Sequence, residues 1–552
     1  MSNFEIDYRL YLSVLFLVVA VAAVQIKMAE VPSGPWEGLY RSFPLFWSFI
    51  IIALTILLRI TVFGPTEVKQ YMLYAVPLLT VLVAVPTLKW GVPYGIRDPW
   101  IHLDLIKSES ITQDNMYPML HSLFRIIAEL SDVPPRELLS RVQVVGPGVG
   151  AIWLITVVRR INPSSWHVAG LALFPVCYMW FISRPYTVAP LIVLLVWWVV
   201  VNNSSDWKHH LLLILFIIVS VWWHPVAGII NGFVLLSAVL TWKLIRIKAI
   251  NSVFQTITPS RERLAIISGI VLVVVLIHHL IYNTTVVEAT LSRAFIITSG
   301  GSEGNSPVVV GNISDKIFEA LRRTMFVLAI GFTSFVTLIT QLKQRRIDQF
   351  LLMSIIATAI LGMVFLGLDL LPGLAFGVRR ANTLAPLLLV PAGAIVFRES
   401  STSSRRLLIA FLILSTGVAV AYSSPIIGGA EGGSTMSDVQ SVKWLHSYQG
   451  NSPVVGSENT IYIAQGIYGD KSVDTLTNGQ RFRYQSIKRQ YRHPWTYDQN
   501  LPDTVEETYV VLSKQHRVSI QSEKKRQDLQ SFVLRTDRVY SNGNVWVHKD
   551  NN

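Results

Sequence analysis

The sequence Arg97-Asp98-Pro99-Trp100-Ile101-His102-Leu103-Asp104 places two carboxylates, an imidazole and a guanidinium within eight residues. It follows an apolar run, residues 70–88, that is long enough to cross a lipid bilayer. Charged side chains beside hydrocarbon cost free energy, so the default interpretation of such a segment is a functional site. The motif therefore predicts a membrane protein with a polar site at one surface of the membrane.

The composition supports a membrane protein with many spans. Hydrophobic residues make up 51% of the 552 positions and charged residues 15%, with a mean hydropathy of +0.46. A soluble domain carries about 25% charged residues. The net charge of +13 comes from short basic clusters between apolar runs, which is typical of membrane topology and does not favour a nucleic-acid partner. The single cysteine, Cys177, excludes a disulfide framework and a metal site built from several thiolates.

Apolar runs predict about thirteen membrane spans, because a helix needs about 20 mainly apolar residues to cross the bilayer. The expected spans are 8–28, 43–63, 70–88, 142–158, 165–182, 186–201, 210–223, 226–242, 264–282, 323–342, 350–371, 383–397 and 406–424. The first run lacks a small-residue cleavage site, so we expect a retained span and not a signal peptide. The fold class is thus a polytopic α-helical membrane protein, with residues 1–424 as its transmembrane domain.

Basic residues predict the orientation of these spans. A cytoplasmic N-terminus puts the basic clusters near 159–160, 243–248, 343–346 and 398–406 on the cytoplasmic side, as the positive-inside rule requires. The segments that then face outward are the loops 89–141 and 283–322 and the hydrophilic tail 425–552. Within the first outer loop, residues 116–130 are amphipathic and are expected to lie at the membrane interface as a helix that does not span.

The tail, residues 425–552, is predicted to form a small extracytoplasmic α/β domain. Residues 437–448 have helical character, and 453–456 and 508–512 have the pattern of short strands. Residues 538–548 alternate in polarity around an Asn-Gly turn, which is a strong hairpin signal.

Unusual polar residues collect on the predicted outer side. Asp98, His102 and Asp104 lie in the first outer loop, and Arg184, His224 and the pair Arg379-Arg380 lie at outer ends of spans. The positive-inside rule disfavours arginine at these ends, so the arginines predict an anionic ligand at the outer face.

Each of these residues also has a structural interpretation. Asp98 can cap a short helix that begins at Pro99, a role compatible with catalysis. His102 shares a helix face with Asp98, and a hydrogen-bonding role for it is open beside a catalytic one. The arginines can reach lipid headgroups, and His224 can be a packing residue at the interface.

The layout of residues 1–424 resembles the GT-C glycosyltransferases, membrane enzymes that take a sugar from a polyprenyl-phosphate carrier. The likeness is to archaeal dolichyl-phosphate-sugar-dependent transferases, including mannosyltransferase-like proteins. It rests on Gly95-Ile96-Arg97-Asp98-Pro99-Trp100-Ile101-His102-Leu103-Asp104, Tyr117-Pro118-Met119-Leu120-His121, Trp223-His224-Pro225 and Arg379-Arg380. The resemblance implies a GT-C-like fold, a polyprenyl-phosphate-linked sugar donor, a glycan or glycoprotein acceptor and a place in the cell envelope.

Two departures from the related oligosaccharyltransferases shape this expectation. Their tail motif Trp-Trp-Asp-Tyr-Gly is not matched by the nearest segment here, Val442-Lys443-Trp444-Leu445-His446-Ser447-Tyr448, and a second acidic pair is not evident. A metal-independent monosaccharide transferase without a cofactor therefore fits better than metal-dependent glycosylation of sequons.

The hypothesis for the reaction assigns a role to each residue of the site. Asp98 is the first choice for general base and Asp104 the second, while His102 orients the base or binds sugar. Arg379 or Arg380, together with Arg184, would bind the carrier phosphate through guanidinium forks. His224 and Arg97 complete the predicted set of substrate-binding residues.

Two rival functions remain open at this stage. A flippase or exporter of lipid-linked saccharide would place ionisable residues through the depth of the spans, whereas here they collect at one interface. An outer-face sensor would bind its ligand with the tail and use the spans as a scaffold.

Overall fold

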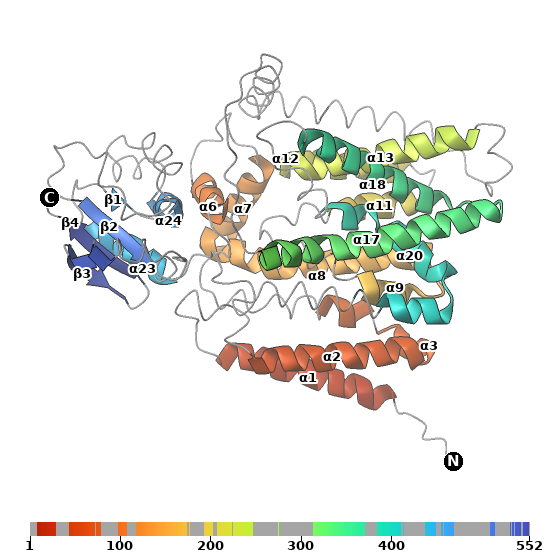
Figure 1. Ribbon diagram of the computed structural model, residues 1–552, viewed down its shortest axis with the longest axis horizontal. Coiled ribbons are helices and arrows are strands. Elements are labelled where there is room, and N and C mark those ends of the chain that lie inside the picture. The colour runs from red at the N-terminus through yellow and green to blue at the C-terminus, as the bar shows by residue number, and fades with distance from the viewer. Residues whose placement is uncertain are drawn as a thin grey trace.

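The computed structural model describes much of the apolar part of the chain and parts of its tail. The described residues are 8–28, 44–71, 73–78, 98–107, 118–173, 176, 192–202, 207–223, 225–246, 274, 313–369, 384–409, 412, 436–448, 454–455, 458–468, 508–513, 530–531, 533–534, 536–542 and 545–550. Figure 1 shows long helices side by side in a helical body and a small sheet at one end. Helices α6, α7 and α24 lie between the body and the sheet.

The helices of the body overlap the predicted apolar runs, except the short helix α3, which lies between two of them. They are α1 (Tyr8–Met28), α2 (Pro44–Phe63), α3 (Thr66–Lys69), α8 (Pro135–Ile161), α9 (Trp166–Leu173), α11 (Ile192–Asn202), α12 (Trp207–Trp223), α13 (Pro225–Arg246), α17 (Ile313–Lys343), α18 (Gln349–Asp369) and α20 (Val390–Glu399). The predicted bounds of α1 and α2 are confirmed to within one residue. The expected spans 264–282 and 406–424 lie almost wholly outside the described residues.

Proline residues fix where several helices begin. Helices α2, α8 and α13 each start at a proline, as does α7 (Pro118–Ser131). Proline has no N–H to donate, and the first-turn N–H groups of a helix have no partner inside the helix. A proline at this position therefore starts a helix without losing a hydrogen bond.

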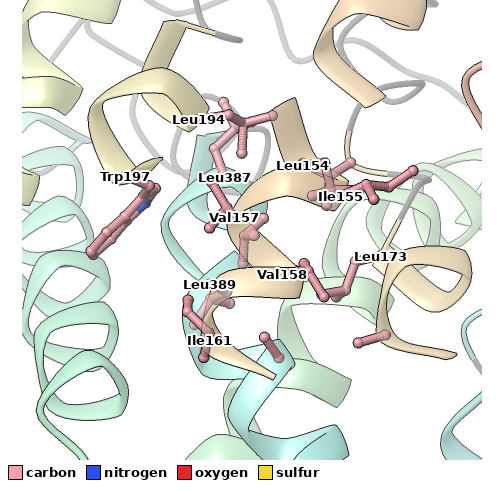
Figure 2. Packing of buried hydrophobic residues seen from close by; sticks show 14 of the residues in the cluster. Leu154, Ile155, Val157, Val158, Ile161, Leu173, Leu194, Trp197, Leu387 and Leu389 are labelled. Atoms are coloured by element: carbon pink, nitrogen blue, oxygen red, sulfur yellow. The ribbon is translucent and has the colours of Figure 1, made fainter. Parts of the chain in front are cut away.

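The core of the body is a continuous set of aliphatic side chains. Figure 2 shows Leu154, Val157 and Ile161 of α8 packed with Leu194 and Trp197 of α11 and with other buried aliphatic residues. Among the described helices, α13 and α17 contain windows, Ala227–Leu244 and Met325–Lys343, that are long and apolar enough to cross a membrane.

Several basic clusters that were predicted to share one side of the membrane meet at one end of the body. Arg398 contacts Asp348 at 2.7 Å and donates to the carbonyl of Ile161 at 3.2 Å. Arg346 contacts Glu399 at 2.8 Å. The ends of α8, α17, α18 and α20 therefore lie together, as a shared side requires. That this side is cytoplasmic remains a prediction.

The tail contains the predicted helix, strands and hairpin. Its elements are α23 (Met436–Tyr448), β1 (Val454–Val455), α24 (Glu458–Tyr468), β2 (Thr508–Ser513), β3 (Asp537–Ser541) and β4 (Val545–Asp550). The described strands form a sheet in the order β1-β2-β4-β3, in which β1 and β2 are parallel and the other pairs antiparallel. The predicted elements are confirmed, and α24 is an additional helix that the sequence pattern did not reveal.

Candidate functional site

The acidic motif folds into a short helix, α6 (Asp98–Lys107). The sequence predicted a helix that begins at Pro99 with Asp98 as its cap, and the helix begins one residue earlier, at Asp98. Pro99 is then the second helical residue, where its missing N–H still costs no hydrogen bond. Asp98 lies in the first turn, where the positive end of the helix dipole favours an acidic residue.

An apolar cluster fixes α6 in place. It joins α6 to its neighbour α7, to the start of α8 and to both tail helices, as Figure 1 shows for the placement of these elements. The buried members are Trp100, Leu103, Ile106, Leu120, Phe124, Leu138, Leu139, Val439, Val442, Ile463 and Ala464. Helices α6 and α7 and the tail helices thus share one core, although they are far apart in the sequence.

One side of α6 carries a histidine pair. Nδ1 of His102 lies 2.7 Å from Nε2 of His121 on α7, and the ring centroids are 5.0 Å apart. The two residues are only 4% and 3% exposed. Burial, together with the charge of His102, lowers the pKa of His121 to about 2. His121 therefore stays neutral across the physiological range, and the pair is a buried hydrogen bond between two helices.

The opposite side of α6 binds the tail helix α24. Nζ of Lys107 donates to the carbonyl oxygens of Gly466 at 2.9 Å and Ile467 at 3.1 Å. These carbonyls belong to the last turn of α24, where a cation is favoured by the helix dipole. Burial lowers the pKa of Lys107, the charge of Asp104 opposes this effect, and Arg136 adds to it.

Helices α6 and α24 approach each other closely at Trp100 and Gly466. A Cβ atom at Gly466 would lie 2.8 Å from the carbonyl oxygen of Trp100 and 2.9 Å from its Cε3 atom. Only glycine allows so close an approach of the two helices. The indole of Trp100 is fully buried beneath α24.

The two aspartates of the motif occupy different sides of α6. Asp104 is 8% exposed and follows Trp100 by four residues, so it belongs to the side that α24 covers. Asp98 precedes His102 by four residues and belongs to the side of the histidine pair. At 3.6 residues per turn, positions 98 and 104 are about 120° apart around the helix axis.

The structure places only part of the predicted site. Asp98, His102 and Asp104 lie on α6, whereas Arg97, Arg184, His224, Arg379 and Arg380 lie outside the described residues. Within the described ranges, no three His, Cys, Asp or Glu side chains come together as metal ligands. Independence from metal stays a prediction.

Two residues that sequence reasoning gave no role take part in the site. His121 belongs to the quoted segment Tyr117–His121, and its signal is a histidine on the apolar side of an amphipathic helix. Lys107 was not considered in the sequence analysis, and its partner could not be identified because α24 was not predicted.

Comparison with known proteins gives no family for this chain. No family model and no curated protein matches the sequence. Among solved structures, the chain is similar to the oligosaccharyltransferase of Archaeoglobus fulgidus, solved in complex with zinc and sulfate. Sequence identity is 12% and the TM-score is 0.39, over 86% of this chain and 72% of that chain. A similarity this low assigns neither a family nor an activity.

Proposed function

We propose that the protein is a membrane glycosyltransferase that moves a sugar from a polyprenyl-phosphate carrier to an acceptor hydroxyl at the outer face of the membrane. The observation that carries this proposal is the position of α6, which is held between the apolar body and the polar tail. A carrier lipid reaches such a border through the membrane, and a glycan or glycoprotein acceptor reaches it from water. The acidic motif lies where the two substrates would meet.

The surface of the body supports its placement in a lipid bilayer. On α17, the side chains of Leu328, Phe332 and Phe335 are each more than half exposed and lie along one stripe of the helix. Exposed apolar surface of this extent is costly in water and marks contact with lipid or a partner. Lipid is the occupant that matches a helix long enough to span.

Asp98 is the general base in this proposal. Asp104 belongs to the side of α6 that the tail helix covers, whereas Asp98 is the first residue of the helix. The acceptor oxygen attacks the anomeric carbon, and its proton passes to the Asp98 carboxylate. The bond from that carbon to the phosphate oxygen breaks, and polyprenyl phosphate leaves with the electron pair. Direct displacement of this kind inverts the anomeric centre.

The predicted phosphate site completes the mechanism. Arg379 and Arg380, with Arg184, His224 and Arg97, are proposed to hold the carrier phosphate. Guanidinium groups bind phosphate oxygens in pairs and stabilise the negative charge that develops on the leaving group. Stabilising that charge is expected to contribute most of the rate enhancement, since polyprenyl phosphate needs no protonation to leave.

The buried polar residues favour an enzyme over a flippase. Among the body side chains that the structure describes, the buried polar ones are serine, threonine, asparagine and glutamine, apart from His167 near the start of α9. A polar path for an anionic headgroup needs ionisable residues through the depth of the spans. The described side chains do not provide one.

The paired variants Asp98→Asn and Asp104→Asn test this proposal. The purified protein in lipid nanodiscs would be given a polyprenyl-phosphate-linked sugar carrying a radiolabel, and transfer to acceptor would be measured beside carrier binding. We expect Asp98→Asn to lose about 100-fold or more in rate with binding retained, because a general base contributes roughly that factor. Asp104→Asn should transfer sugar at a rate much closer to wild type.

Two outcomes would contradict the proposal. Full transfer by the Asp98→Asn variant removes the assigned base. Movement of the labelled lipid between leaflets of a vesicle, without transfer to any acceptor, would instead identify a flippase.

A further inference from the structure

We propose that His121 is a positioning residue that acts through His102. In this arrangement Nδ1–H of His102 donates to Nε2 of His121, so His102 gains and loses its proton at Nε2. The inference rests on the proposed function, because it concerns a group beside the assigned base.

The geometry of the pair fixes one ring relative to the other. The two nitrogens are 2.7 Å apart, a hydrogen-bond distance, and the rings are inclined by 51°. The partners come from different helices, α6 and α7, and both side chains are buried. Because this hydrogen bond joins two packed helices, it restricts rotation of the imidazole ring of His102.

The surroundings decide which member of the pair carries charge. Both rings are buried, and burial, together with the charge of His102, lowers the pKa of His121 to about 2. A proton taken up by the pair therefore resides on His102. Neutral His121 then offers the lone pair of Nε2 to His102 whether His102 is charged or neutral.

This arrangement couples His102 to the base. Asp98 and His102 share a side of α6, so a charge on His102 stabilises the Asp98 carboxylate and makes it a weaker base. Sugar transfer should therefore fall on the acid side as His102 becomes charged. An acceptor at His121 favours the charged form of His102 and so sets the pH at which this fall occurs.

The other titratable groups near α6 are the same in wild type, His121→Phe and His121→Gln. They belong to α6 itself and to the elements that share its apolar cluster. On α6 they are Asp98, Asp104 and Lys107; on α7, Arg125 and Glu129; on α8, Arg136, Glu137 and Arg141; on α23, Asp438, Lys443, His446 and Tyr448; on α24, Glu458, Tyr462 and Tyr468. Only the acceptor at position 121 changes.

The test measures kcat and KM against pH for wild type, His121→Phe and His121→Gln. Phenylalanine keeps the ring volume and removes the acceptor, and glutamine restores an acceptor oxygen. The fall of kcat/KM at low pH is the acid limb of the profile. We expect its midpoint to move down by about one pH unit in His121→Phe, because the free energy of a hydrogen bond to a charged group corresponds to roughly one pKa unit. It should stay near its wild-type position in His121→Gln.

Two further variants act as controls. His102→Gln should leave only the fall in kcat/KM that protonation of the Asp98 base causes at still lower pH. His446→Gln, at an exposed tail histidine that stacks on Tyr468 with centroids 3.8 Å apart, should leave it unchanged. An acid limb at the same pH in wild type and His121→Phe overturns the proposal, and so does a fall in kcat without a shift of the limb.

A second measurement reads the protonated nitrogen directly in the wild-type chain. Solid-state NMR of the wild-type chain with nitrogen-labelled histidine reports which ring nitrogen carries the proton, and His102→Gln assigns the signal. Neutral His102 protonated at Nδ1 supports the proposal, whereas protonation at Nε2 overturns it. Absence of sugar transfer by wild type would contradict the proposed function. The NMR measurement would then still test whether His102 donates a hydrogen bond to His121.

Discussion

At the scale of single residues, the two sides of α6 contact different helices. Trp100, Asp104 and Lys107 face the tail helix, while His102 faces α7 and shares its side with Asp98. The sequence alone could not separate the two aspartates, because both lie in one short motif. Their separation became clear only from what covers each side of the helix.

The substitution Gly466→Ala should loosen the contact between α24 and α6. The added methyl group would meet the backbone oxygen of Trp100 at 2.8 Å, and backbone atoms cannot move aside cheaply. We expect a loss of about 1–3 kcal/mol in stability, as for other overpacked sites. Thermal unfolding in detergent and hydrogen exchange at the amides of α24 would measure it.

A matched control is Gly362→Ala on α18, where no atom lies within 4 Å of the added carbon. This variant should keep wild-type stability or gain about 0.4–1 kcal/mol, because alanine restricts the unfolded chain. Equal melting temperatures for Gly466→Ala and wild type would show that the close approach of α24 to Trp100 is not needed.

At the scale of elements, the sequence predicted what local periodicity and composition control. Apolar runs located α1, α2, α12 and α13, and the Asn-Gly turn located the hairpin of β3 and β4. Helix α24 was missed because its segment, Glu458–Tyr468, is rich in β-branched and aromatic residues and contains Gly466, all weak helix formers. Packing against Trp100 stabilises this segment as a helix, and no local sequence pattern predicts that contact.

Spin labels can test whether the exposed stripe of α17 faces lipid. After replacement of Cys177 by serine, single cysteines would be placed at Phe332 and Tyr448, which are 69% and 66% exposed. We expect a label at Phe332 to collide with dissolved oxygen, which concentrates in the bilayer. A label at Tyr448 in the tail should collide with a water-soluble nickel chelate instead. Equal access of the chelate to both labels would show that α17 is in contact with water.

At the scale of the whole molecule, the tail helices and helices α6 and α7 form one structural unit. Val439, Val442, Ile463 and Ala464 of the tail bury the same cluster as Trp100 of α6. The sequence suggested a boundary near residue 425 from composition alone, because a polar segment follows an apolar one. It could not show that helices on either side of that boundary pack together, since such contacts depend on the complete fold.

A fragment of residues 425–552 should therefore fold incompletely. Without α6, the buried face of α24 has lost its partner, and a helix of this length is marginal in water. We expect the α24 amides to exchange quickly in the fragment and slowly in the full chain. The amides shared by β2 and β4 should stay protected in both, since their pairing lies within the fragment. Protection of α24 in the isolated fragment would contradict a shared unit.

The hydrogen bond from Lys107 to Gly466 joins residues 359 positions apart, which sets an order for biosynthesis. A ribosome adds about 5–20 residues per second, so α6 is complete roughly 20–70 s before α24 leaves the exit tunnel. During that interval Trp100 has no tail helix above it, and a chaperone or the insertion machinery has time to bind there. The acidic motif can reach its final geometry only near the end of translation, so a chain truncated before α24 would be inserted in the membrane without a finished site.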